Sequence, residues 1–235
     1  MQFLRSLLFT GFFLLFTFCY AIFFVLVGPL LPWRRRFVLA TIWANVLLGA
    51  LRLICGLGVR VEGREHLPTD RACIALMKHS SSWETFAQAA LLPPQVWVLK
   101  RELMWIPFVG WGLRLLRAIA INRGSGGAAV RQMIEQGRQH LTDGHWIVVF
   151  PEGTRMPQGQ TRRYGVGGAA VAAATGAPII PVAHNAAWFW PRRGLLKRPG
   201  TIRVVIGPPI ATLGRDPREI NEEAQRFIEA NSGPP

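Results

Sequence analysis

The sequence contains few cysteines. Its 235 residues include only Cys19, Cys55 and Cys73, which show no paired spacing and no C-x-x-C motif. We therefore expect neither a disulfide framework nor a zinc site, and we interpret the three thiols as small buried side chains. Internal repeats are also absent, as are both glycine-rich nucleotide-binding patterns, G-x-x-x-x-G-K-[ST] and G-x-G-x-x-G. The glycine-rich segment 124–127 is accordingly interpreted as a loop.

Negative charge is scarce as well. The chain has 13 acidic and 27 basic residues, which gives a formal net charge of +14. Lysine occurs only at positions 78, 100 and 197, so most of the positive charge is arginine, which suits bidentate phosphate contacts and the headgroup region of a bilayer. The excess predicts an anionic partner, either nucleic acid or anionic lipid. Composition alone does not choose between the two.

Apolar residues are concentrated before residue 60. The segment 7–31 is almost wholly apolar and carries no charge, so as a helix it could cross a ~30 Å hydrocarbon layer. No convincing small-x-small cleavage site follows Tyr20, which favours a retained anchor over a cleaved signal peptide. Pro29 and Pro32 are expected to end the helix, and Trp33 suits the membrane interface. The arginines at 34–36 predict a cytoplasmic flank.

A second apolar segment, 37–57, contains the single charge of Arg52 and ends at Gly56 and Gly58. The two segments could form a hairpin or a pair of helices lying partly in one leaflet. The alternative is that the second segment is a buried helix of the globular domain. We assign residues 1–58 to a membrane anchor of one or two apolar helices, 59–231 to one domain, and 232–235 to a disordered tail.

From residue 59 onward, short apolar runs of strand type alternate with helical stretches. This alternation predicts an α/β fold, with a mixed, mainly parallel sheet flanked by helices. The expected strands are 59–61, 72–77, 96–99, 118–121, 146–150, 178–182 and 202–206. The expected helices are 83–92, 127–141, 167–174 and 217–230.

A histidine and a glutamate stand at the end of the second expected strand, within K-H-S-S-S-W-E at 78–84. Active residues of α/β sheets collect at such strand ends. His79 could accept a proton near neutral pH, and a carboxylate on its other nitrogen would fix its tautomer. On a regular helix the side chains of His79 and Glu84 would lie ~140° apart. They can meet only if His79 precedes the helix and the serines at 80–82 cap a turn. The alternative is a helix cap with a surface histidine.

A second motif, F-P-E-G-T-R, occupies positions 150–155 after the strand at 146–149. Gly153 permits a tight backbone approach, Thr154 offers a hydroxyl, and Arg155 could grip a phosphate with two parallel hydrogen bonds. Lys100 and Arg123 each follow an expected strand and could reach the same rim as His79. The alternatives are an ordinary turn with an arginine salt bridge and a solvated basic face.

The order and spacing of these motifs resemble the glycerolipid acyltransferase family, and within it the 1-acyl-sn-glycerol-3-phosphate acyltransferases. The family's H-x-x-x-x-D block corresponds to His79–Glu84, with glutamate in place of aspartate, and its F-P-E-G-T-R block is matched in full. Its second block corresponds to K-x-E-L at 100–103 through Gly110-Trp111, and its fourth to I-P-V at 180–182. The resemblance spans about residues 60 to 210. It departs at 164–167, where Y-G-V-G lacks the lysine of the family's F-K-x-G and leaves Arg162 or Arg163 as substitutes.

This resemblance implies roles for the motif residues. His79 would be the general base, and Glu84 would orient it. Lys100 and Arg155 would hold the acceptor's phosphate, with Arg123 a weaker candidate. The residues that shape the phosphate pocket would be Glu152, Gly153 and Thr154.

The resemblance also implies a reaction. The free sn-2 hydroxyl of lysophosphatidic acid would be esterified by an acyl group from acyl-CoA or acyl-carrier protein, giving phosphatidic acid. Neither a metal nor a cofactor is implied. The enzyme would lie at the cell inner membrane with its catalytic domain in the cytoplasm.

Two other functions remain open at this point. One is a sister acyltransferase that uses glycerol-3-phosphate or a lyso-aminolipid as acceptor. The other is a non-catalytic basic membrane protein that tethers nucleic acid. The second accounts for the charge, but no nucleic-acid-binding motif is present and the basic residues are scattered along the chain.

Overall fold

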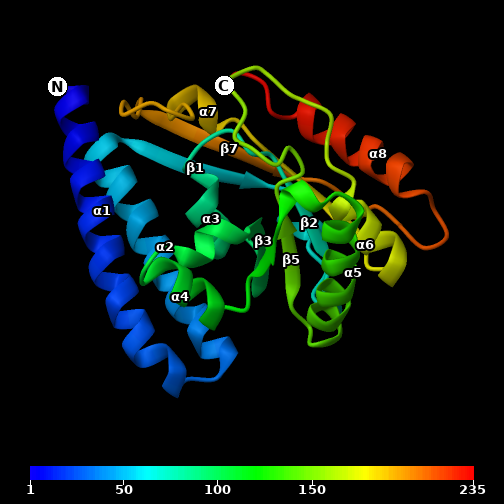
Figure 1. Cartoon of the computed structure of the whole chain (residues 1–235). Coiled ribbons are helices and arrows are strands. Elements are labelled where there is room, and N and C mark those ends of the chain that lie inside the picture. The colour runs from blue at the N-terminus through cyan, green and yellow to red at the C-terminus, as the bar shows by residue number, and fades with distance from the viewer.

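The two N-terminal apolar segments form long helices that lie side by side (Figure 1). The computed structural model describes the backbone of residues 1–235 and every side chain except that of Arg123. Helix α1 (Gln2–Val27) is followed by a 3₁₀ turn, η1 (Gly28–Leu30), and by α2 (Trp33–Cys55). Pro32 adopts an extended conformation that breaks the chain between the helices, and α2 ends at Gly56 in the left-handed region, with φ of 69°. Both helical segments are long and apolar enough to cross a membrane.

Helix α2 combines the two interpretations that its sequence left open. One of its faces contributes Ala44, Leu47 and Leu51 to the core of the globular part, whereas Ile42 and Leu53 on other faces are exposed. A helix that is apolar on all sides can serve both a protein core and a lipid phase. The second apolar segment is therefore a core helix that also has the composition of an anchor.

Trp33 lies in a different place from the one expected. Its indole is buried, stacks on the His145 ring at 3.6 Å, and donates through Nε1 to the carbonyl of Leu116 at 3.1 Å. The indole N–H finds a fixed acceptor inside the protein, so it does not need the polar interface of a bilayer. Trp33 thus fastens the start of α2 to the globular part instead of facing headgroups.

A seven-stranded sheet carries the rest of the fold, in the order β1-β7-β6-β2-β5-β3-β4. All neighbouring strands are parallel except β6 and β7, so β1 and β7 run opposite to the other five. The predicted mixed, mainly parallel α/β fold is confirmed, and each predicted strand is present. The strands are β1 (Leu57–Glu62), β2 (Ile74–Met77), β3 (Gln95–Lys100), β4 (Ile119–Ile121), β5 (Trp146–Val149), β6 (Ile179–His184) and β7 (Gly200–Ile206).

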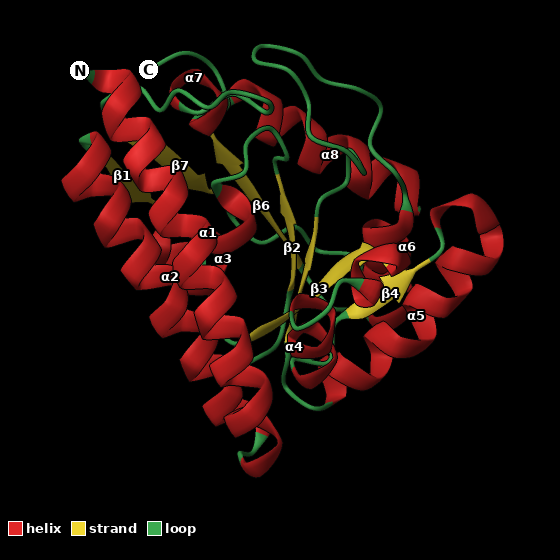
Figure 2. Cartoon of the chain, turned by 60° about the vertical axis from the view of Figure 1, so that its left-hand side comes forward, coloured by secondary structure: helices red, strands yellow, loops and turns green.

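Helices cover both faces of the sheet (Figure 2). One core lies between the sheet and the helices α1, α2 and α3, and the other lies between the sheet and α5, α6 and α8. The four predicted helices are observed, whereas the short helices α4 and α7 were not expected. Flanking helices are α3 (Glu84–Leu91), α4 (Val109–Leu115), α5 (Gly127–Thr142), α6 (Gly167–Thr175), α7 (Ala186–Phe189) and α8 (Pro217–Ala230).

The direction of the strands positions the site. Strands β2, β3, β4, β5 and β6 are mutually parallel and therefore end at one edge of the sheet. His79 follows β2, the F-P-E-G-T-R segment follows β5, and Lys100 ends β3. Residues 21 to 76 positions after His79 are thus brought to the same edge.

Candidate active site

His79 and Glu84 form a hydrogen-bonded pair at this edge. The Nδ1 atom of His79 lies 2.9 Å from a carboxylate oxygen of Glu84, and no described group hydrogen-bonds to its Nε2 atom. Because an ionised carboxylate can only accept, Nδ1 carries the proton and Nε2 keeps a free lone pair. The imidazole packs against the Phe150 ring, with centroids 4.3 Å apart, which fixes its plane. The arrangement suits proton abstraction at Nε2.

The turn between the two residues explains how they meet. Glu84 is the first residue of α3, and His79 precedes the helix. The backbone N–H groups of Ser80 and Ser81 each donate to the Glu84 carboxylate at 2.8 Å, and the Ser81 hydroxyl accepts from the Trp83 N–H at 3.2 Å. The chain therefore wraps around the carboxylate, while a serine hydroxyl stabilises the turn as expected.

Burial and hydrogen bonding act in opposite directions on Glu84. Complete burial alone would raise the pKa of its carboxyl, but the hydrogen bond from His79 and the interaction with His184 outweigh this, so the pKa is lowered. The carboxylate is therefore ionised at neutral pH. A fixed negative charge beside Nδ1 would stabilise an imidazolium if Nε2 accepted a proton.

A second histidine, His184 at the end of β6, lies close to the same carboxylate. It is fully buried, and its Nε2 atom lies 2.9 Å from the Lys78 carbonyl and 3.8 Å from the Glu84 carboxylate. The Ala186 N–H donates to its Nδ1 atom, so Nε2 carries the proton. Burial lowers the pKa of His184 and keeps it neutral. His184 holds the strand end of β2 and is not available as a base.

Lys78 forms a buried ion network below His79. Its ammonium group lies 2.7 Å from Glu152 and 2.8 Å from both carboxylate oxygens of Glu229 in α8. The hydroxyls of Tyr164 and Thr161 also donate to Glu229, at 2.6 and 2.8 Å. This network joins the strand end of β2, the loop after β5 and the C-terminal helix.

The F-P-E-G-T-R loop grips the backbone of His79 on both sides. The Glu152 carboxylate accepts the His79 N–H at 2.5 Å, and the Met156 N–H donates to the His79 carbonyl at 2.7 Å. Between them Gly153 adopts the left-handed conformation with φ of 68°, which glycine allows without strain. Glu152 is buried against Lys78 and does not line the cavity. It holds His79 in place through the backbone N–H of that residue.

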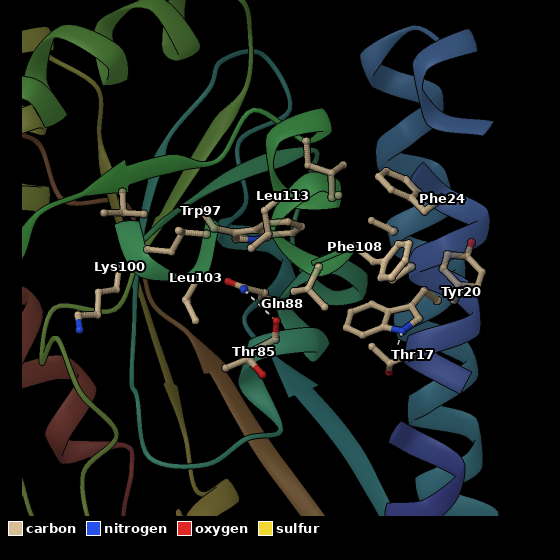
Figure 3. A pocket seen from close by; sticks show the side chains of 18 of the residues that line it. Thr17, Tyr20, Phe24, Thr85, Gln88, Trp97, Lys100, Leu103, Phe108 and Leu113 are labelled. Atoms are coloured by element: carbon tan, nitrogen blue, oxygen red, sulfur yellow. Dashed lines mark hydrogen bonds between the residues drawn. The ribbon is translucent and has the colours of Figure 1, made fainter. Parts of the chain in front are cut away.

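Figure 3 shows an apolar cavity of about 350 Å³. His79 is one of the residues that line it. Its wall comes from α1, α2, α3, the end of β3 and the segment around α4, and Tyr20, Phe24 and Phe108 lie at the anchor end. The anchor helices are therefore part of the site. The lining residues closest to the predicted chemistry are His79, Lys100, Phe150 and Arg155.

The basic residues singled out in the sequence occupy different positions. Arg155 is half-buried in the cavity wall, whereas Lys100 is exposed at the rim and forms an ion pair with Glu102 at 3.2 Å. Thr154 is half-buried beside Arg155. The side chain of Arg123 lies outside the described part of the structure, so its expected role stays a prediction.

Comparison with known proteins places this site in a family. The family model described as "Acyltransferase" matches residues 58–185, which contain every motif discussed above. The chain belongs to the acyltransferase family. It is an enzyme of O-acyl transfer, and the network around His79 and Glu84 lies inside the matched region, except for Glu229.

Individual relatives agree with this assignment. The chain is 41% identical over 206 residues to a 1-acyl-sn-glycerol-3-phosphate acyltransferase of Pseudomonas aeruginosa, covering 86% of this chain and 80% of the relative. It is 28% identical over 204 residues to the human 1-acyl-sn-glycerol-3-phosphate acyltransferase alpha, covering 86% and 72%. The crystal structure of the 1-acyl-sn-glycerophosphate acyltransferase PlsC from Thermotoga maritima superposes with a TM-score of 0.81 at 26% identity, over 98% and 95% of the two chains.

Sequence reasoning missed three residues of this acyltransferase's site. Lys78 and His184 are buried polar residues, and Glu229 lies on a helix far along the chain. Lysine is rarely buried without a partner, so a lysine directly after the apolar run 72–77 was the available signal. His184 and Glu229 carry no comparable local signal.

Proposed function

We propose that this acyltransferase esterifies the free sn-2 hydroxyl of lysophosphatidic acid and releases phosphatidic acid. The observation that carries the proposal is the His79–Glu84 pair at the end of an apolar cavity whose wall also contains Arg155. The cavity suits an acyl chain, and the arginine suits a phosphate. The names of the relatives support this acceptor.

The proposed reaction begins with proton abstraction. His79 Nε2 removes the proton of the acceptor hydroxyl while Glu84 stabilises the imidazolium through Nδ1–H. The hydroxyl oxygen attacks the carbonyl carbon of the acyl thioester, the C–S bond breaks, and the leaving thiolate takes the proton back from Nε2. The ester forms without an acyl-enzyme, and the histidine returns to its neutral form. The donor is an acyl thioester of coenzyme A or of acyl-carrier protein.

Membrane location follows from the two apolar helices, which indicate membrane association. We place the anchor at 1–58 and the acyltransferase domain at 59–231, followed by a tail at 232–235. An inner-membrane enzyme with a cytoplasmic domain suits both the arginines at 34–36 and a water-soluble thioester donor.

Arg155 provides the test of the acceptor. A hydrogen bond to a charged group is worth roughly 1.5–3 kcal/mol, so its loss should raise the acceptor's KM about tenfold or more if chemistry is slow. Arg155→Lys should impair use of lysophosphatidic acid markedly, because lysine cannot form the bidentate contact, and Arg155→Ala should be worse. The donor's KM should change much less.

The measurement is steady-state kinetics on a fixed detergent or lipid surface, with each substrate varied in turn. Arg215→Ala serves as the control, since Arg215 precedes α8, pairs with Glu223 of that helix and does not line the cavity. An acceptor panel with lysophosphatidic acid, glycerol-3-phosphate and a lyso-aminolipid tests the substrate class. Preference for either of the last two, or an Arg155 effect confined to the donor, would overturn the proposal.

A further inference from the structure

The segment 101–111, which links β3 to α4, exposes a group of large apolar side chains. It comprises the 3₁₀ helix η3 (Arg101–Trp105), a turn and the start of α4. Trp105 is 64% exposed and Trp111 is 46% exposed, and their apolar neighbours are exposed to a similar degree. A cluster of this kind on a protein surface marks a contact with another apolar phase or partner. The exposed apolar residues of the segment are Leu103, Trp105, Ile106, Val109 and Trp111.

The segment adjoins the apolar surface of the anchor. The ring of Phe108 packs edge-on against Phe18 of α1, with centroids 5.9 Å apart. Phe18 itself is more than half exposed, and so are Leu14 and Leu15 on the same helix. Figure 2 shows α4 beside α1, so the two exposed surfaces are neighbours.

Charge around the segment identifies the partner. Arg101 lies over the Trp105 ring at 6.0 Å, and Arg114 is in the last turn of α4. The one acidic residue of the segment, Glu102, is already paired with Lys100. Tryptophan next to arginine is the combination found at the boundary between lipid headgroups and acyl chains, where the ring is amphipathic and the cation meets phosphate.

The backbone of the segment makes a tight turn. Phe108 adopts φ of 60°, which is unusual for a residue other than glycine, and Gly110 packs so closely on the Met104 carbonyl that a Cβ would collide with it. The close turn leaves the apolar side chains of the segment exposed.

We propose that residues 101–111 insert into the headgroup–acyl boundary of an anionic bilayer, as a second membrane contact beside the helical hairpin. Leu103, Phe108 and Val109 also line the cavity next to His79, so this wall of the cavity lies in the lipid. A lysolipid can then reach Arg155 and His79 laterally from the leaflet without leaving it. The inference rests on the proposed membrane location of α1 and α2.

Spin labels in the full chain, reconstituted into vesicles with anionic lipid, test the insertion. Cys19 is the exposed native cysteine, so Cys19→Ser provides the background. Single labels are placed at Ile106→Cys, at Leu15→Cys on the anchor, and at Glu222→Cys on the exposed side of α8. Collision with oxygen, which partitions into lipid, is compared with collision with a water-soluble nickel chelate.

The Ile106 and Leu15 labels should both favour oxygen several-fold relative to the Glu222 label. If Ile106 behaves like Glu222 while Leu15 lies in lipid, the segment does not insert and this inference alone fails. If Leu15 also lies in water, the proposed membrane location fails. Spin–spin broadening at Ile106 would mean that the segment contacts a second copy of the chain, which also overturns the proposal.

Activity gives an independent readout. Trp105→Ser with Trp111→Ser should reduce turnover of long-chain lysophosphatidic acid in vesicles several-fold but leave turnover of a short-chain, monomeric acceptor unchanged. The matched control is Leu195→Ser with Leu196→Ser, which removes two exposed apolar side chains from another loop. Equal losses on both acceptors would indicate damage to the fold and contradict a membrane contact.

Discussion

At the scale of single residues, the site depends on one imidazole held by three kinds of contact. Glu84 fixes its tautomer, Phe150 fixes its plane, and the F-P-E-G-T-R loop holds its backbone N–H and carbonyl. None of these contacts uses Nε2. The Nε2 atom is therefore positioned by these contacts without being used by them, in a side chain that lines the cavity.

Replacing His79 should abolish acyl transfer. General-base catalysis typically contributes about 10²–10⁴-fold, so His79→Ala should lower turnover by at least that range. Folding and membrane association should persist, because the residue's backbone bonds to Glu152 and Met156 do not need the side chain. Turnover is measured with saturating donor and acceptor, and flotation with vesicles reports membrane association. A variant with near-normal turnover would remove His79 from the mechanism.

Replacing Glu84 by glutamine tests the role of its negative charge, because the side chain keeps nearly the same shape. In Glu84→Gln the amide cannot stabilise an imidazolium and presents an NH₂ or a weaker acceptor to the N–H groups of Ser80 and Ser81, so turnover should fall strongly. Stability should fall by roughly 1.5–3 kcal/mol for a lost charged hydrogen bond. Because the pKa of Glu84 is lowered by folding, this stabilisation is present above the unfolded pKa and is lost as the pH falls through the folded one.

Glu84→Asp is the comparison, since it keeps the charge and shortens the side chain by one methylene. It should retain substantial activity. Unfolding curves and kinetics of the two variants at several pH values provide the measurement. If Glu84→Gln is as active as the parent, Glu84 only begins a helix and the pair has no catalytic role.

At the scale of elements, the C-terminal helix α8 is joined to the end of β2 by one buried lysine between two carboxylates. Burial raises the pKa of Glu152 to about 7, although Lys78 and the His79 N–H act in the opposite direction. The neighbouring charge of Glu229 raises it further. This part of the protein therefore changes its charge near neutral pH.

The network predicts a pH dependence of stability. Folding raises the pKa of Glu152 above the ordinary value of 4.5. The stabilisation that protonated Glu152 gives the folded state is therefore fully present below pH 4.5 and is lost as the pH rises through about 7. The loss is on the order of 3 kcal/mol at 1.36 kcal/mol per pKa unit. Glu152→Gln should lack this pH-dependent component. The free energy of unfolding of the variant, relative to that of the parent, should therefore increase as the pH rises from 4.5 to 7. Thermal and urea unfolding in detergent measure the difference.

Glu229→Gln supplies the internal comparison. Removing the neighbouring negative charge should lower the pKa of Glu152 and move the same transition to lower pH. Identical pH profiles for the parent, Glu152→Gln and Glu229→Gln would contradict a coupled network.

At the scale of the whole molecule, the cavity exists only because the anchor hairpin packs against the globular part. Helix α2 covers one face of the sheet, α1 covers α2, and the α4 segment closes the space beside His79 (Figures 1 and 2). The acyl-chain length that the enzyme accepts from its donor should therefore depend on the side chains where the anchor helices meet the globular part.

Filling the cavity should shorten the acyl chain that the enzyme accepts. Gly112 of α4 lines the cavity, and an added Cβ would lie 3.4 Å from the Phe24 ring. Gly112→Leu should reduce kcat/KM for long-chain donors much more than for short-chain ones, because the extra side chain occupies the space of the distal methylenes. Gly49→Leu is the control, since Gly49 lies on exposed α2 surface with nothing within 4 Å. A uniform loss across chain lengths would contradict the assignment of this cavity to the acyl chain.

The sequence by itself determined the local structure and the chemical groups of the site. Short apolar runs of strand type and the helical stretches between them predicted every strand of the sheet and four of its helices, because these patterns act over a few residues. The motif H-x-x-x-x-E predicted a contact that one turn of the chain can make. The expected headgroup position of Trp33 was wrong because a buried acceptor, the Leu116 carbonyl, competes with the bilayer for its N–H.

Only the tertiary structure decided which distant groups meet. Lys78 and Glu229 lie 151 positions apart, and the His184–Lys78 contact spans 106 positions. These contacts depend on the order β1-β7-β6-β2-β5-β3-β4 and on the packing of α8 against the sheet. Local propensity carries no information about the strand order or about the packing of α8. The free energy that selects the strand order comes from burying both faces of the whole sheet at once. The cavity between anchor and domain is decided in the same way.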